Sequence, residues 1–317
     1  MVVNHRTVVT GEAAEERNLG NNQPVVSVII PVYNDADRLA VCLMALDGQT
    51  YPRHLLEIVV VDNGSEDDVA EIAERFEGVR LLREPRPGSY AARNRGIVEA
   101  KGDIIAFTDA DCRPTSTWIE RAVRHLVDNP GIGVVGGRIE VVAMDPNNPN
   151  GVELYEIMTG FPQQRYIEEF RFAATASMFT RMSVFDLVGL FNEELMSGGD
   201  REWGMRVHAS GFPLRYADDV ITVHPARNTL RQLYMKSKRR HAGVRDASSM
   251  RKSSRASGKK LLRNLVPPVR TGWRMLQDDR VPTIWAWVRL VAVLTLVRLL
   301  SVWFTLRFAV GGRSPRR

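Results

Sequence analysis

The chain has 317 residues, 44% of them hydrophobic and 25% charged, which is a composition typical of a globular protein. This composition excludes intrinsic disorder, and two cysteines are too few for a disulfide-built fold. The net charge of +6 is uneven, because residues 227–317 hold 22 Lys and Arg residues against three Asp residues. The rest of the chain is net acidic, so we expect the two parts to contact different partners.

The first residues predict a location in the cell. Residues 1–24 are polar and of mixed charge, and they lack the apolar core of a signal peptide. We therefore expect a flexible lead-in, a cytoplasmic protein, and free thiols at Cys42 and Cys112.

Strand-like and helix-like patterns alternate over residues 25–142, which predicts an α/β fold with a mostly parallel sheet and helices on both faces. The expected elements, in chain order, are a strand at 25–32, a helix at 37–46 capped by Asp35, a strand at 57–61, a helix at 67–76, a strand at 79–82, a helix at 89–100, a strand at 103–107, a helix at 117–127 and a strand at 133–142. An irregular, aromatic-bearing insertion follows, and then a strand at 173–179, helices at 181–188 and 200–210, and two short strands within 213–224.

Polar side chains follow three of these strands, at Tyr33 and Asn34, at Asp62 and Ser65, and at Asp109 and Asp111. Each motif alone is also explained by turn residues that face solvent. The carboxyl ends of parallel strands meet at one edge, so the three motifs together predict a ligand crevice. The first strand ends without a glycine-rich dinucleotide fingerprint or a phosphate-binding Walker loop, which excludes a nicotinamide enzyme and a P-loop ATPase.

These motifs resemble those of the family 2 nucleotide-sugar glycosyltransferases, whose fold is called GT-A. The resemblance covers about residues 25–225 and rests on the segments 28–34, 60–65, 88–96, 109–111 and 199–202. It implies a site for a nucleoside-diphosphate sugar, with UDP favoured over GDP or TDP. The residues that it implies for this site are Pro31, Tyr33, Asn34, Asp62, Ser65, Arg86, Gly88, Arg93, Asp109 and Asp111.

The resemblance also implies a divalent cation, Mn²⁺ or Mg²⁺, on Asp111. A hard cation prefers carboxylate oxygen and stabilises the negative charge that develops on a departing diphosphate. His224 follows a strand and is expected either as a further metal ligand or as a structural histidine at the sheet edge.

Asp200 is the expected general base, and an aspartate that caps the helix is the alternative. The family pattern is Glu-Asp, and Gly199 stands here in place of the Glu, which leaves open what orients the base. Gly199 and Glu202 are expected on the acceptor side, although Glu202 could equally form a helical ion pair with Arg206. A single base opposite the diphosphate implies inversion at the anomeric carbon.

The expected organisation is a catalytic domain at 25–226, with a nucleotide half at 25–112 and an acceptor half at 113–226, then a basic segment at 227–265 and an apolar helical tail at 266–317. Residues 284–310 are long and apolar enough to span a bilayer, but Arg289, Arg298 and Arg307 interrupt them. This pattern favours a helix on an anionic membrane surface, and packing on the soluble domain or a partner is the alternative.

The predicted function is that of an inverting, metal-dependent, non-processive glycosyltransferase at the cytoplasmic face of the cell membrane. The acceptor is expected to be a hydroxyl group of a glycolipid, a lipid-linked molecule or a polysaccharide precursor. A nucleotidyltransferase and a non-catalytic sugar- or membrane-binding scaffold are the alternatives. The acidic domain disfavours a nucleic-acid partner, because it would repel phosphates.

Overall fold

A computed structural model describes residues 23–250, 273, 275–281 and 283–309, so most of the predicted lead-in and all of residues 251–272 lie outside the described residues. Eight strands form one sheet in the spatial order β3-β2-β1-β4-β7-β6-β8-β5. In chain order they are β1 (Val26–Val32), β2 (Leu56–Asp62), β3 (Val79–Arg83), β4 (Ile104–Phe107), β5 (Arg113–Pro114), β6 (Val134–Val142), β7 (Met178–Arg181) and β8 (Leu214–Pro225).

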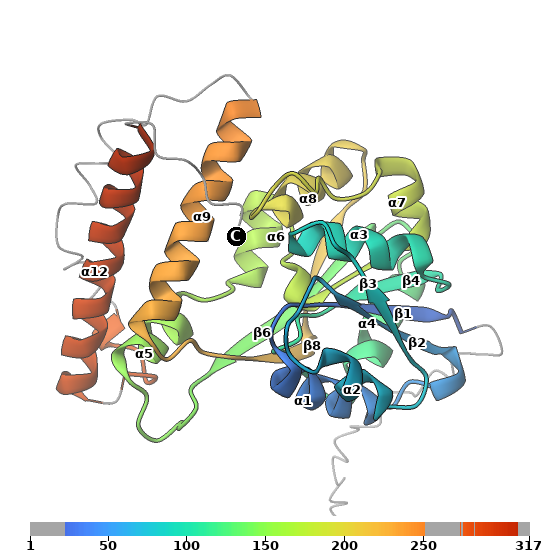
Figure 1. The fold of residues 1–317 in the computed structure, drawn as a ribbon, viewed down its shortest axis with the longest axis horizontal. Coiled ribbons are helices and arrows are strands. Elements are labelled where there is room, and N and C mark those ends of the chain that lie inside the picture. Colours follow the sequence, from blue (N-terminus) through green and yellow to red (C-terminus); the bar gives the residue numbers. More distant parts are fainter. Residues whose placement is uncertain (1–22, 251–272, 274, 282, 310–317) are drawn as a thin grey trace, which may run out of the picture.

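Helices cover both faces of the sheet, as predicted (Figure 1). One face packs against α1 (Ala36–Asp47), α2 (Val69–Glu74) and α4 (Trp118–Val127), and the other against α3 (Ser89–Glu99), α6 (Gln163–Phe170), α7 (Met182–Val188) and α8 (Gly199–Ala209). Along β1, Val28 and Ile30 point into the first core and Ile29 into the second. Both faces of the strand are therefore apolar, which is why the central strands are continuous hydrophobic runs in the sequence.

The first half of the sheet is parallel and the second half is mixed. β1 pairs in parallel with β2 and β4, and Val32 lies in register with Asp62, so the polar ends of these strands meet at one edge. β7 runs antiparallel to both β4 and β6. The polar strand ends that were predicted to share one edge of the sheet therefore do so.

Three local predictions differ from the structure. The strand expected at 173–179 begins only at Met178, because Gln163 hydrogen-bonds the backbone of Ala174 and Ser177 and a short 3-10 helix forms at Thr175–Ser177. The two short strands expected within 213–224 are one strand, β8, whose pairing with β6 shifts register between Gly137 and Arg138.

Asp35 is the third difference. It stands at the N-cap of α1, but its side chain accepts a hydrogen bond from Arg38 Nε at 2.6 Å and not from the helix backbone. Asp67 instead accepts from the Ala36 backbone N–H at 2.8 Å. A residue from the loop after β2 therefore accepts the hydrogen bond of the backbone N–H group at the start of α1.

A helical layer lies beyond the sheet, and α9 (Leu230–Met250) and α12 (Ile284–Ala309) run side by side in it, with α5 (Gly151–Thr159) at one end (Figure 1). Much of the predicted basic segment is thus one helix. Leu154 of α5 packs against Leu290 and Leu294 of α12. Within the described residues, α12 alone is long and apolar enough to cross a membrane, and 22% of its most apolar window is buried.

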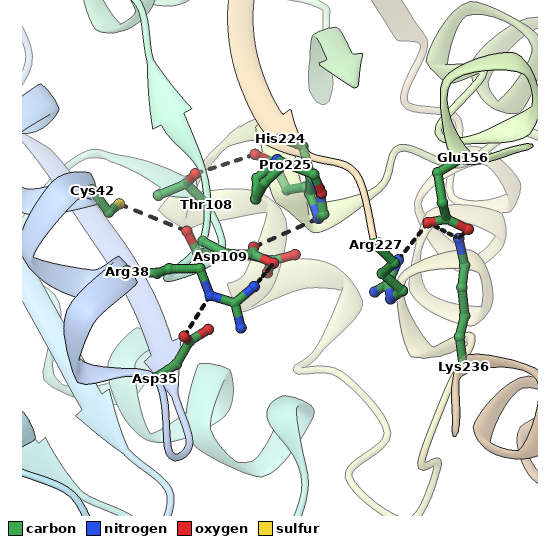
Figure 2. A network of polar contacts seen from close by, with 12 residues as sticks. Asp35, Arg38, Cys42, Thr108, Asp109, Glu156, His224, Pro225, Arg227 and Lys236 are labelled. Atoms are coloured by element: carbon green, nitrogen blue, oxygen red, sulfur yellow. Dashed lines mark hydrogen bonds and ion pairs between the residues drawn. The ribbon is translucent and has the colours of Figure 1, made fainter. Parts of the chain in front are cut away.

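A buried carboxylate ties α9 to α5. Glu156 is 2% exposed and accepts from Arg227 Nη1 at 2.7 Å and from Lys236 Nζ at 2.8 Å (Figure 2). Burial alone would raise the pKa of Glu156, but the charges of Lys236 and Arg227 hold it below its ordinary value. Glu156 therefore remains ionised and neutralises part of the charge on two cations.

We expect the Glu156→Gln variant to be less stable by about 3–5 kcal/mol, because two partly buried cations would face a neutral amide. Since the folded pKa is lowered, this stabilisation is present above the unfolded pKa of 4.5 and is lost as the pH falls below it. Urea denaturation at neutral and acidic pH measures both effects. Glu71→Gln is the matched control, since the Glu71–Arg75 pair is exposed and should contribute less than about 1 kcal/mol. Equal stability of the two variants would contradict this role.

Candidate active site

Acidic and imidazole groups gather at the carboxyl end of β4. Ligand atoms of Asp109, Asp111, Cys112 and His224 all lie within 4.8 Å of one another. The short strand β5, which the sequence analysis missed, pairs with β8 so that Arg113 lies opposite Val223. This pairing brings Asp111 next to His224 across more than 100 residues of chain.

The ring nitrogens of buried His224 have different partners. Nδ1 lies 2.8 Å from the Pro225 carbonyl oxygen, which requires Nδ1 to carry the proton and leaves a lone pair on Nε2 in the neutral ring. Nε2 lies 3.6 Å from Asp111 Oδ1. Two acceptors that face each other at this distance suit a cation between them. The structure therefore brings together the residues predicted for a divalent-cation site, Asp111 and His224.

Cys112 is a poor ligand for the expected cation. The residue is buried, and burial together with the charges of Asp109 and Asp111 raises the pKa of its thiol well above the ordinary value. Mn²⁺ and Mg²⁺ also prefer oxygen and nitrogen to sulfur. The ligand set that remains is two carboxylates and one imidazole.

Each carboxylate of the pair has an arginine beside it. Buried Arg93 donates to Asp109 Oδ1 at 2.5 Å, and Arg38 Nη1 lies 3.8 Å from Asp111 Oδ2. Arg93 was predicted here and Arg38 was not. Arg38 lies one helical turn after Asp35, which itself follows the polar end of β1, and this spacing is the signal that could have identified it.

The ends of β1 and β2 are joined by side-chain hydrogen bonds. Asp62 Oδ1 accepts from the Ser65 backbone at 2.9 Å, and Ser65 Oγ accepts from the Asn34 backbone at 3.0 Å. Asn34 has a left-handed backbone with φ of 49°, which asparagine tolerates better than most residues. The predicted residues Asp62, Ser65 and Asn34 therefore lie together, with exposed Tyr33 beside them.

Asn63 was not predicted, and it holds the loop after β3. Its Nδ2 donates to the carbonyls of Glu84 at 2.8 Å and Arg86 at 2.7 Å, while its Oδ1 accepts from the Gly88 backbone at 2.8 Å. Gly88 has φ of 131°, a conformation that L side chains rarely adopt. The loop therefore lies against the end of β2, but the Arg86 guanidinium is paired with Glu84 at 2.9 Å and Glu193 at 2.6 Å.

Asp200 lies in the first turn of α8. Its Oδ1 accepts from the Arg201 backbone at 2.8 Å and from the Tyr90 hydroxyl at 3.2 Å. The N-cap residue of α8 is Gly198, so the interpretation of Asp200 as a helix cap is wrong. Burial raises the pKa of Asp200, and the nearby charge of Arg93 opposes this.

Gly199 leaves room for the ring of Tyr90. A Cβ at Gly199 would lie 2.8 Å from that ring, closer than real Cβ atoms approach. The Tyr90 phenol thus occupies the space beside Asp200 and contacts its carboxylate, so Tyr90 orients Asp200 in this chain.

Glu202 forms the helical ion pair with Arg206 that was predicted as the alternative to an acceptor-side role. Its carboxylate lies 2.8 Å from Arg206 Nε, and Arg206 also donates to the carbonyls of Val188 and Leu190. The pair therefore anchors α8 to the chain that follows α7.

Helix α9 brings positive charge toward the site. Desolvation and the charge of Arg227 lower the pKa of Arg239, while the charge of Asp109 opposes this shift. Lys236, which lies in the same predicted basic segment, forms its ion pair with Glu156.

Sequence comparison finds a family model and named glycosyltransferases that resemble this chain. A family model described as glycosyl transferase family 2 matches residues 27–188. Glycosyltransferase AglE of Haloferax volcanii is 42% identical over 209 residues, which cover 64% of this chain and 68% of AglE. Pre-mycofactocin glycosyltransferase of Mycobacterium tuberculosis is 31% identical over 218 residues, which cover 65% of this chain and 44% of that protein.

Solved structures share the fold. Mannosyltransferase PcManGT from Pyrobaculum calidifontis, in complex with GDP-Man and Mn²⁺, superimposes with a TM-score of 0.58 at 21% identity, covering 94% of this chain and 83% of PcManGT. Residues 1–349 of S. aureus TarS, in complex with UDP, give a TM-score of 0.53 at 16% identity, covering 90% of this chain and 91% of that TarS chain. These likenesses confirm the predicted α/β fold of the GT-A type.

Proposed function

Because the chain belongs to glycosyl transferase family 2, we propose that it transfers a sugar from a nucleoside diphosphate to a hydroxyl acceptor, with inversion at the anomeric carbon. The observation that carries this proposal is the cluster of Asp109, Asp111 and His224 ligand atoms at the strand edge. A cation held there would lie where a diphosphate can approach from the ends of the parallel strands.

Asp111 and His224 hold the cation in this proposal, and Mn²⁺ is favoured because the similar mannosyltransferase structure contains it. When bound, the cation supplies positive charge that stabilises the departing diphosphate. Asp109, fixed by Arg93, lies nearer the ribose and sugar.

The donor lies across the ends of β1 and β2. Pro31, Tyr33 and the linked turn of Asn34, Asp62 and Ser65 surround the base and ribose, while Arg86, Gly88 and Arg93 lie near the diphosphate. UDP is the favoured nucleotide, with GDP and TDP as alternatives.

Asp200 removes the proton of the acceptor hydroxyl, and Tyr90 orients it. A raised pKa makes the Asp200 carboxylate a stronger proton acceptor. With one base and no covalent nucleophile, the acceptor oxygen displaces the diphosphate directly, which gives inversion. Gly199 and Glu202 belong to the acceptor side, where they position Tyr90 and the start of α8.

The reaction takes place at the cytoplasmic face of a membrane and adds one sugar per encounter to a glycolipid, lipid-linked or polysaccharide precursor. Residues 25–226 form the catalytic domain, and the segments 227–265 and 266–317 supply the membrane contact. The excess of basic residues after position 226 supports this location, because anionic lipid headgroups attract Lys and Arg.

Calorimetric titration of the full chain with UDP, GDP and TDP, with and without Mn²⁺, tests the proposed function. We expect one nucleotide to bind in a Mn²⁺-dependent way, and its sugar conjugate then to act as donor in a transfer assay. If none of the three binds under either condition, the non-catalytic scaffold becomes the better explanation.

Tyr90→Phe is expected to lower kcat about fivefold, the effect of one hydrogen bond of about 1 kcal/mol. The hydroxyl stabilises ionised Asp200, so its loss should move the acidic limb of the kcat/KM profile to higher pH. Arg93 and Asp109, which also act on Asp200, remain in the variant. Tyr216→Phe is the control, since Tyr216 donates to Asp218 on β8. An acidic limb that stays in place would show that Tyr90 does not orient the base.

A further inference from the structure

Large apolar side chains are exposed on one side of α12 near both ends of the described helix, while Thr295 and Val302 on the same side are half-buried and buried. The exposed side chains of this side, here called the strip, fall within an arc of about 100° at 3.6 residues per turn, and they are Ile284, Trp285, Val288, Leu299, Trp303 and Leu306. Trp285 is 70% exposed and Leu299 is 49% exposed. Exposed apolar side chains gathered on one side of a helix are typical of a surface that binds an apolar partner.

The opposite side of α12 is packed against protein. Its buried residues are Ala286, Leu290, Val293, Leu294 and Phe304. Val293 packs with Leu233 of α9, and farther along the helix Phe304 lies against Tyr234 with ring centroids 5.4 Å apart. His241 Nε2 and Ser301 Oγ are 3.0 Å apart. The two helices are therefore joined over several turns (Figure 1).

Tryptophan and arginine alternate along one edge of the strip. Trp285 and Arg289 are one turn apart, and the same pair recurs at Trp303 and Arg307, where the guanidinium lies 5.0 Å from the indole centroid. The two pairs are five turns apart and so share one edge of the helix. Tryptophan and arginine together are typical of side chains that lie at the level of lipid headgroups.

We infer that α12 docks side-on to an anionic bilayer, with its axis in the plane of the membrane surface and its exposed strip immersed. This inference rests on the membrane location proposed above and not on the transfer reaction. The Trp/Arg edge then lies among the headgroups, and the strip enters the outermost part of the hydrocarbon.

The packing on α9 argues against a helix that spans the bilayer. Between Arg231 and Arg240, α9 carries five Lys and Arg residues, and Lys236 is held by Glu156. A spanning α12 would either carry these charges into hydrocarbon or lose its contacts with α9. Side-on docking keeps the contacts and leaves α9 in water.

Charge favours a bilayer over a second copy of the chain. Pairing two α12 strips would bring together two C-terminal regions, each with 22 Lys and Arg residues against three Asp residues. Like charges at such an interface oppose association, whereas anionic headgroups complement them.

Vesicle co-sedimentation of the full chain tests the docking surface. We expect binding to phosphatidylcholine vesicles that contain phosphatidylglycerol, and weaker binding to phosphatidylcholine alone. Leu299→Glu should weaken binding by at least about tenfold, because a charge replaces an immersed apolar side chain. Leu187→Glu is the matched control, because Leu187 is 73% exposed on α7 and outside the strip, and it should bind like the wild type. Equal binding of the two variants would overturn the proposal.

Depth measurement separates side-on docking from spanning. Both native cysteines are buried and burial raises the pKa of their thiols, so a nitroxide will label Val288→Cys, Leu299→Cys and Leu306→Cys selectively. Side-on docking predicts one shallow depth at all three positions. A label at 299 that is deeper than those at 288 and 306 would show a span and overturn the proposal.

Two other outcomes would also overturn the inference. Labels that remain in water with every vesicle would exclude docking, and sedimentation velocity that shows a dimer lost in Leu299→Glu would assign the strip to a second copy. Calorimetry should show that Leu299→Glu still binds the donor nucleotide, so that a loss of vesicle binding is not mistaken for a loss of the proposed function. If the wild type bound no donor nucleotide, the proposed function would be refuted, but the conclusion from vesicle binding would be unaffected.

Discussion

Asp111→Ala is expected to abolish the Mn²⁺-dependent part of nucleoside-diphosphate binding. Asp111 lies 3.6 Å from His224 Nε2 and 3.8 Å from Arg38, so its removal takes away one metal ligand and the anionic neighbour of that arginine. Loss of even an outer partner of a metal ligand weakens binding about 10–100-fold, so loss of the carboxylate itself should cost at least about 100-fold. Titration calorimetry with the preferred nucleotide, with and without Mn²⁺, measures this loss.

Asp103→Ala provides the matched control. Asp103 directly precedes β4 at the edge away from Asp111, and its carboxylate accepts only an exposed backbone hydrogen bond from Val25 among the contacts described. This variant should bind nucleotide and Mn²⁺ like the wild type. If Asp111→Ala kept Mn²⁺-dependent binding while melting normally, the cation would have to lie elsewhere.

The strand ends could be predicted because their signals are local. An apolar run that stops at Asp62 or at Asp109 already specifies a buried strand and a polar turn, and side-chain alternation places Asp109 and Asp111 on one side. The same continuous apolar strands also predict a sheet that helices cover on both faces. These features need no knowledge of which strands pair.

The partners of the site residues could not be predicted, because distant pairing decides them. His224 reaches Asp111 through β5, a strand of two residues that has too little sequence to give a pattern. Tyr90 reaches Asp200 from 110 positions away, and only the space left at Gly199 allows it.

The false strand at 173–179 has a similar cause. Its residues are apolar and read as a strand, but the Gln163 side chain binds the backbone of Ala174 and Ser177 and turns the chain before Met178. A buried side-chain amide thus overrides local propensity. Periodicity carries no information on such a contact.

Asp200→Asn is expected to lower kcat about 10²–10⁴-fold and to leave nucleotide binding intact, because an amide of the same shape can keep the Arg201 contact but cannot accept the proton. Transfer assays and donor titration on the same preparation measure both quantities. Asp186→Asn, on the exposed side of α7, is the control and should retain wild-type kcat. A non-catalytic scaffold would tolerate both substitutions equally. Since Asp200 is not one of the clustered cation ligands, lost turnover with retained Mn²⁺-dependent donor binding would assign it to the acceptor's proton.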